Sequence, residues 1–154
     1  MEKEEHKNGT YVEVVPNTTT KNLLSQWSRK HLVTNPIQAD KYHTTLVYSR
    51  KGTPKVQAYP INLPIKCKVK ELKIFPTQMK NTNGKCLVAV LDSKELNNHF
   101  DKIHRGYGCS YDFPEYIPHI TLSYSFVGEV PKDLPDFEIV FDKKKVSALD
   151  MEYK

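Results

Sequence analysis

The chain has 154 residues, of which 38% are hydrophobic and 27% are charged, and its formal net charge at pH 7 is +5. This length and composition predict a globular protein with a buried core, and they exclude an intrinsically disordered chain. The mild positive charge favours anionic partners such as phosphates and nucleotides, but it is too small to indicate duplex nucleic acid.

The cysteines and the first residues of the chain indicate the cellular compartment in which we expect the protein. Cys67, Cys86 and Cys109 are widely spaced and form no C-x-x-C pair, so they carry no zinc or redox signature. We expect reduced thiols in a cytoplasmic protein. The charged N-terminal residues do not resemble a signal peptide, and no apolar run approaches the ~18 residues of a membrane span, so we expect no membrane partner.

The first half of the chain predicts a strand, a helix and a second strand. Residues 1–10 have the composition of a flexible polar tail, and residues 11–15 are rich in β-branched side chains and precede a proline, which favours a strand. Asn17 or one of the three threonines after it can cap a helix with one apolar side. Asn35 and Pro36 break that helix ahead of the second strand.

The second half begins after a loop at 50–64 that is rich in proline and glycine. Residues 65–75 alternate between apolar and mostly lysine positions, which predicts a half-buried strand. The sequence Asn-Thr-Asn-Gly at 81–84 favours a hairpin turn into a buried strand at 86–91. We therefore expect a β-hairpin in this region.

A second helix begins after Ser93, a suitable N-cap, and ends at two glycines. The loop at 107–118 is rich in aromatic residues and leads into another strand. Residues 137–141 and 146–153 have the pattern of two closing strands around a basic turn at 143–145. The order strand, helix, strand therefore occurs twice in the chain.

One heptapeptide occurs twice and marks this repeated order. The first copy, His-Thr-Thr-Leu-Val-Tyr-Ser, begins at His43, and the second, His-Ile-Thr-Leu-Ser-Tyr-Ser, begins at His119, 76 residues later, with five of the seven positions identical. A repeat spaced by half of the chain predicts a single domain, 1–154, built of two pseudo-symmetric lobes at 11–64 and 65–154. We expect an α+β fold, with antiparallel sheet and flanking helices around a central cleft.

Each copy places a histidine and a threonine two residues apart. Because residues i and i+2 of a strand share a face, His43 and Thr45 point the same way, as do His119 and Thr121. The leucine and the tyrosine of each copy then point to the opposite face, which packs under a helix. If the two lobes face each other, two imidazoles and two hydroxyls converge on one volume.

This set of groups suits the cleavage of a phosphodiester. In-line displacement requires a base on the attacking oxygen and an acid on the leaving oxygen, and histidine can serve as either near neutral pH. Threonine hydroxyls can donate hydrogen bonds to the non-bridging oxygens, where negative charge develops. The two motifs contain no carboxylate or thiolate, so we expect no metal and no cofactor.

Paired H-x-T-L strands half a chain length apart resemble the 2H phosphoesterase superfamily. Within it, the sequence is most similar to the phage anti-CBASS proteins, through Tyr11, the run at 111–122 and the pair Glu152 and Tyr153. The resemblance implies that the two histidines are the catalytic pair and that the two threonines hold the scissile phosphate. It also implies that Tyr11 and Tyr153 bind nucleobases, that Glu152 is an acidic residue on a base, and that Tyr107 contributes to substrate binding.

The reaction implied by the resemblance opens a cyclic di- or trinucleotide, a messenger of bacterial antiviral defence, at a 3′–5′ linkage by attack of the ribose 2′-hydroxyl. If phage-encoded, such an enzyme would act in the host cytoplasm. Two other functions stay open: a 2H phosphodiesterase acting on 2′-5′ oligoadenylates or RNA 2′,3′-cyclic phosphate ends, and a nucleotide sponge that binds without cleavage. The sequence leaves open which histidine is the acid and which nucleobases the site prefers. It also leaves open the oligomeric state and whether the loop at 107–118 acts as a lid.

Overall fold

The computed structural model describes residues 9–50, 52, 56, 59–111 and 115–149. In chain order its elements are β1 (Gly9–Pro16), α2 (Thr18–Lys30), the 3₁₀ helix η1 (Ala39–Lys41), β2 (Thr44–Ser49), β3 (Ile65–Pro76), β4 (Lys85–Asp92), α3 (Lys94–Tyr107), β5 (His119–Ser123) and β6 (Ile139–Leu149).

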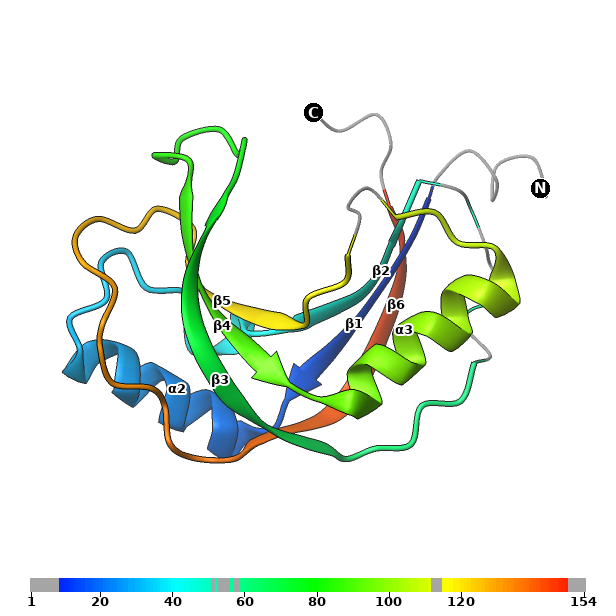
Figure 1. The fold of residues 1–154 in the computed structure, drawn as a ribbon, viewed down its shortest axis with the longest axis horizontal. Helices are drawn as coiled ribbons and strands as arrows, with labels where there is room; N and C mark the ends of the chain where they lie inside the picture. The colour runs from blue at the N-terminus through cyan, green and yellow to red at the C-terminus, as the bar shows by residue number, and fades with distance from the viewer. Residues whose placement is uncertain (1–8, 51, 53–55, 57–58, 112–114, 150–154) are drawn as a thin grey trace.

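The strands form one six-stranded sheet in the order β2-β1-β6-β3-β4-β5, and each neighbouring pair is antiparallel. Figure 1 shows this sheet bent into a trough. The long β3–β4 hairpin rises as one arm, β1, β2 and β6 form the other, and the helices lie outside the trough. The predicted α+β class is confirmed.

The two edge strands of the sheet meet across the trough. The Thr44 hydroxyl on β2 donates a 3.0 Å hydrogen bond to the His119 carbonyl on β5. The Tyr116 hydroxyl, just before β5, donates a 2.7 Å hydrogen bond to the Thr45 carbonyl. Because the motif strands stand at opposite ends of the sheet order, the bend of the sheet is what brings them together.

Both helices begin where the sequence predicts them. The Asn17 side chain caps α2 and the Ser93 side chain caps α3, each by accepting a backbone N–H of the first turn. Leu24 and Trp27 bury the apolar side of α2 in the core. Gly108 ends α3 in the left-handed conformation with φ 66°, which glycine adopts without steric cost.

The closing part of the chain differs from its prediction. Instead of two strands around a basic turn, β6 is a single strand that runs through 143–145 and pairs with β1 over most of its length. A bulge at Asp142 keeps the two strands in register. Lys143 and Lys145 stay exposed, and the Lys144 ammonium donates a 2.9 Å hydrogen bond to the Tyr59 carbonyl. Pairing with β1 therefore overrides the weak strand propensity of lysine.

The position of β6 also relates the two halves of the repeat. It follows β5 in sequence, yet it lies between β1 and β3, which it meets through the pairing of 65–67 with 139–141. The half of the sheet that carries the first motif therefore contains a strand from the second half of the chain.

Strand β1 begins earlier than predicted. Gly9 and Thr10 belong to the strand and not to the tail, and residues 1–8 lie outside the described residues. A Cβ atom at Gly9 would collide with the Ser49 carbonyl oxygen on β2. Glycine at this position therefore permits the backbones of β1 and β2 to approach closely. Because glycine has a weak strand propensity, the sequence did not predict that β1 begins here.

Thr44→Val should destabilise the fold, because it removes the donor to the His119 carbonyl while nearly preserving side-chain volume. Thr44 is fully buried, so we expect a loss of ~1–3 kcal/mol in the free energy of unfolding, measured by urea titration. The matched change Thr19→Val, on the exposed first turn of α2, should stay within ~0.5 kcal/mol. Equal stability of the two variants would show that the bond between the edges contributes nothing.

Candidate active site

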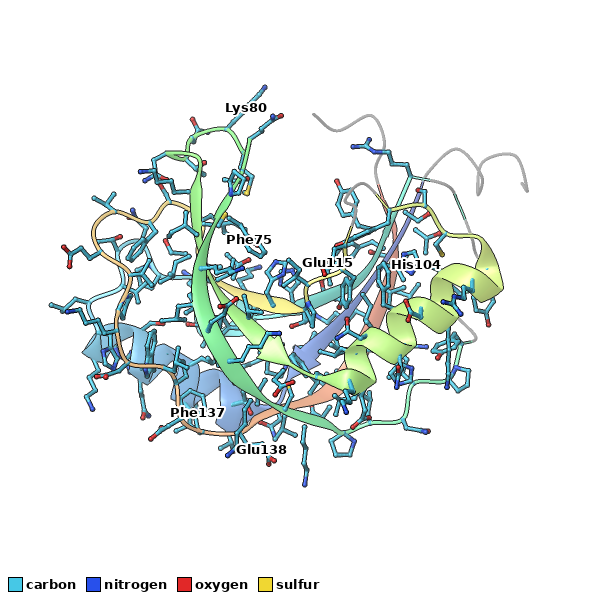
Figure 2. All side chains as sticks on the ribbon, in the orientation of Figure 1. Phe75, Lys80, His104, Glu115, Phe137 and Glu138 are labelled. Atoms are coloured by element: carbon cyan, nitrogen blue, oxygen red, sulfur yellow. The ribbon has the colours of Figure 1, made fainter. Side chains whose placement is uncertain are left out.

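Both His-x-Thr pairs open onto one cavity, which we call the central cavity. It has a volume of about 520 Å³, within the range of small-molecule sites. Figure 2 shows Phe75 and Glu115, two of its lining residues, in the space between the arms of the trough. The structure therefore brings together the four predicted residues, His43, Thr45, His119 and Thr121.

The two imidazoles are held in the same way. His43 Nδ1 lies 2.9 Å from the Lys41 carbonyl oxygen, and His119 Nδ1 lies 2.8 Å from that of Ile117. A carbonyl can only accept, so each Nδ1 carries a proton and donates it. This tautomer leaves Nε2 of both rings as the nitrogen that can exchange a proton with a ligand.

His119 has the drier environment of the two predicted catalytic histidines. The Phe75 ring packs against it edge to face, with centroids 4.9 Å apart. Burial lowers the pKa of His119, the hydrogen bond to the Ile117 carbonyl opposes this, and the charge of His43 lowers the pKa again. His119 is therefore neutral at a pH where an unperturbed histidine is partly charged.

A β-bulge follows the threonine in each motif strand. Where β2 pairs with β1, Leu46 is the extra residue, and where β5 pairs with β4, Leu122 is the extra residue. Both leucines are fully buried, as the alternation predicts. The bulges occupy the same position of the heptapeptide, so the internal repeat extends to the irregularities of the backbone.

These bulges correct the prediction for the motif tyrosines. After one extra residue the alternation of a strand reverses, so Tyr48 and Tyr124 do not share the face of the leucines. Tyr48 stands opposite Tyr11 in the β1–β2 register and contacts its ring edge to face. Tyr124 lines the central cavity. The signal in the sequence was the tyrosine repeated at the same offset in both copies.

Two tyrosine hydroxyls flank the threonines. The Tyr11 hydroxyl lies 3.0 Å from Thr45 Oγ1. Tyr11 is not among the residues that line the central cavity, so its contact with a nucleobase stays a prediction. Burial raises the pKa of Tyr11, the hydrogen bond to Thr45 partly offsets this, and the Glu13 carboxylate raises it further. Burial also raises the pKa of Tyr124, with Glu13 adding to the effect and a hydrogen bond to Thr121 opposing it. Both phenols are therefore neutral at physiological pH.

Helix α3 supports the first motif through an aromatic stack that the sequence did not reveal. The Tyr116 ring stacks on Phe100 with centroids 4.2 Å apart and an interplanar angle of 9°, and Phe100 stacks on His104 at 3.8 Å. The far end of Tyr116 donates to the Thr45 carbonyl. Figure 2 shows His104 on α3, where it takes part in this packing.

The other residues predicted to bind substrate are Tyr107, Glu152 and Tyr153, and the structure describes only the first of them. Tyr107 ends α3 and packs edge to face against Tyr59, with centroids 6.2 Å apart, so its assignment to substrate binding is not supported. Tyr111, four residues further along, lines the cavity instead. Glu152 and Tyr153 lie outside the described residues.

A second cavity adjoins the first. It has a volume of about 600 Å³ and shares only His43 and Tyr124 with the central cavity. Its other walls come from β1, from β6 and from the segment 35–42 that leads into the first motif.

The part of the chain that the structure describes has neither a cluster of metal ligands nor a membrane-spanning helix. There, no three or more histidine, cysteine, aspartate or glutamate side chains gather in a way that could hold a metal ion. Cys67 and Cys86 are buried free thiols, and Cys109 is partly buried. Neither helix in this part combines the length and the apolar character that crossing a membrane requires.

The fold has relatives among solved structures. Apo LigT of E. coli superposes with a TM-score of 0.63 at 14% identity, covering 93% of this chain and 88% of LigT. LigT complexed with 3′-AMP gives 0.63 at 16% identity, covering 92% and 87%. At these identities the likeness establishes the fold. The bent sheet is therefore the fold of the LigT-like 2H phosphoesterases.

Sequence comparison identifies the family to which the chain belongs. Residues 8–154 match the family model described as Anti-CBASS protein Acb1. The Anti-CBASS protein Acb1 of Enterobacteria phage T4 is 32% identical over 160 residues, covering 99% of this chain and 96% of the relative. That of Salmonella phage S16 is 33% identical over 125 residues, covering 81% and 78%. The chain belongs to the Acb1 family of anti-CBASS proteins.

Tyr116→Phe should loosen the first motif strand, because the Thr45 carbonyl loses a partly buried donor while the stack on Phe100 remains. We expect a loss of ~1 kcal/mol in the free energy of unfolding, read from the urea midpoint. Tyr107→Phe is the control, since the Tyr107 hydroxyl has no hydrogen bond within the described residues. An unchanged midpoint for Tyr116→Phe would mean that α3 does not hold the motif through this hydroxyl.

Proposed function

We propose that the chain is a metal-independent phosphodiesterase that cleaves the 3′–5′ linkages of cyclic di- and trinucleotide signals. The observation that carries this proposal is the convergence of both His-x-Thr pairs on one cavity, with Nε2 of each imidazole available to a ligand. Two such nitrogens can place a base and an acid on the two oxygens of one ester.

The environments of the histidines support one assignment of roles. His119, with its lowered pKa, is neutral at working pH and removes the proton from the ribose 2′-hydroxyl. The 2′-oxygen attacks phosphorus, and the bond to the 5′-oxygen breaks. His43 Nε2 protonates that leaving oxygen, and the product carries a 2′,3′-cyclic phosphate. Water can then open this ring to a 3′-phosphate with the two roles exchanged.

Neutral hydroxyls complete the proposed site. Thr45 and Thr121 donate to the non-bridging oxygens of the phosphate, where charge accumulates in the transition state. The hydroxyls of Tyr11 and Tyr124 are hydrogen-bonded to those of Thr45 and Thr121, respectively, and both phenols remain protonated. They orient the threonine hydroxyls toward the phosphate without adding a negative charge that would repel it.

The relatives support a nucleotide substrate. LigT, which shares the fold, has been solved with 3′-AMP and with ATP. The sequence relatives are named as anti-CBASS proteins of phages, so the cyclic oligonucleotides of that defence are the substrates we propose, and the host cytoplasm is the proposed compartment. The net charge of +5 suits an anionic ligand.

The first test is turnover of cyclic di- and trinucleotides in EDTA, with products identified by mass. His43→Ala and His119→Ala should each lower kcat by ~10²–10⁴-fold, because each removes a proton-transfer group. The matched control is His31→Ala on the end of α2, which should retain activity.

Linear 2′-5′ oligoadenylate and RNA with a 2′,3′-cyclic end, offered in parallel, separate the related phosphodiesterases. Stoichiometric release of intact ligand on denaturation would indicate a sponge. Full activity in both alanine variants would overturn the mechanism.

The pH dependence of kcat/KM tests the role of His119. Because the pKa of His119 is lowered, the base form persists as the pH falls through 6.5, and the acidic limb of the profile should lie below 6.5. Phe75→Ala admits water to the ring and should move this limb upward. An acidic limb above 6.5 in the wild type would assign the base to another group.

A further inference from the structure

A row of paired residues leads across the first arm of the trough, from the motif strand β2 to β6. Thr45 on β2 stands opposite Glu13 on β1, and Glu13 stands opposite Lys145 on β6. Figure 1 shows these three strands in one arm. Directly paired residues of antiparallel strands share one face of the sheet, so Lys145 belongs to the face that carries Thr45. Two strand spacings of ~4.8 Å place the two backbones roughly 10 Å apart, and a lysine side chain can span much of that distance.

The second arm has the same row with a different residue in the middle. Thr121 on β5 stands opposite Val88 on β4, and Val88 stands opposite Lys73 on β3. Lys73 is therefore the counterpart of Lys145 in the internal repeat. The repeat thus extends from the motif strand to the third strand of each arm, and it keeps a lysine there.

The two lysines differ in their ion pairing. Lys73 Nζ lies 3.2 Å from Glu71 Oε1, so a carboxylate on the same strand already balances its charge. Lys145 has no ion pair with any residue that the structure describes, although Glu13 stands opposite it. The Glu13 carboxylate acts instead on the two tyrosine hydroxyls of the site, whose pKa values it raises. Lys145 therefore keeps an ammonium group that can bind an anion.

Lys145 lines the second cavity, which shares His43 and Tyr124 with the central cavity. The described residues that line the central cavity include no lysine and no arginine. Lys41 also lines the second cavity, but the carboxylate of Asp40 is next to it on η1. Lys145 is therefore the cation best placed for an anion that extends from the central cavity across β1 and β6.

We propose that Lys145 forms a phosphate subsite in the second cavity, which binds a phosphate of the ring that is not being cleaved. This inference rests on the proposed function and extends it to a group that the histidines do not touch. A cyclic dinucleotide carries two phosphates and a trinucleotide three, and only one of them can lie between His43 and His119. A lysine ammonium donates charge-assisted hydrogen bonds to the oxygens of such a phosphate.

The consequence is a preference for substrates with more than one phosphate. Lys145 would make no contact with the ester that is cut, so it would bind the ground state and the transition state equally. Its contribution would then appear mainly in KM. A ring would gain this contribution, whereas a substrate with a single phosphate would not.

The experiment compares Lys145→Gln with the wild type on two substrates in EDTA. One is the 3′–5′ cyclic ring of two adenosines, and the other is adenylyl-(3′→5′)-adenosine, which has the same bases and one phosphate. Lys145→Gln should lower kcat/KM on the ring about tenfold, mainly through KM, because a charge-assisted contact is lost. For the single-phosphate compound, kcat/KM and the inhibition constant against cleavage of the ring should change less than about twofold.

The salt dependence is a second readout, which a purely structural role of Lys145 would not change. Because salt screens a contact between charges, kcat/KM on the ring should fall more steeply with added salt in the wild type than in Lys145→Gln. Lys145→Arg keeps the charge and should restore both the affinity and the salt dependence.

The matched control is Lys73→Gln, which removes the counterpart of Lys145 in the other arm. Because Glu71 already balances the charge of Lys73, this variant should lower kcat/KM on the ring less than about threefold.

Each outcome bears on the proposal. Equal losses on the ring and on the single-phosphate compound would show that Lys145 acts through the fold, and they would overturn the subsite. Equal losses in Lys73→Gln and Lys145→Gln would also overturn it, because the attraction would then come from the charge of the trough as a whole. A wild type that cleaves no cyclic dinucleotide would instead refute the proposed function, and the subsite with it.

Discussion

The site depends on the contact between the two edges of the sheet. In the sheet order, β2 and β5 are separated by the other four strands. Strand pairing within the sheet therefore does not bring the two histidines together. The bond from the Thr44 hydroxyl to the His119 carbonyl, and that from Tyr116 to the Thr45 carbonyl, close this gap. They use backbone acceptors within the motifs themselves, so any change in the bend of the sheet would also change the relative position of the two imidazoles.

The duplicated heptapeptide can now be understood residue by residue. Histidine and threonine face the cavity, and leucine forms the bulge and enters the core. Of the tyrosines after the bulges, Tyr124 lines the cavity and Tyr48 packs against Tyr11. The final serine anchors the end of the strand: Ser49 bonds to Ser110, and Ser125 accepts the backbone N–H of Asn83. Every identical position thus has either a cavity-facing or a structural function, which explains why these positions match in both copies.

Much of this was predictable because local signals and tertiary structure agree. Capping residues, apolar periodicity and the Asn-Gly turn located α2, α3 and the β3–β4 hairpin, and the motif spacing located the four cavity residues. The misses share one cause. The bulges at Leu46 and Leu122 and the passage of β6 through its lysines are set by pairing with strands distant in sequence. Tyr107 and Tyr116 are both aromatic residues of one region, and only packing against α3 shows which one supports the site.

The central place of β6 has a consequence for the order of assembly during synthesis. Strands β1 and β3 can each find a partner early, β2 and β4 respectively, but the strand that joins these two pairs is translated after all the others. Until residues 139–149 emerge from the ribosome, one edge of β1 and one edge of β3 have no neighbour, and such edges invite association with other chains. A nascent chain halted before this strand would hold both histidine motifs without the joining strand that places them in one sheet.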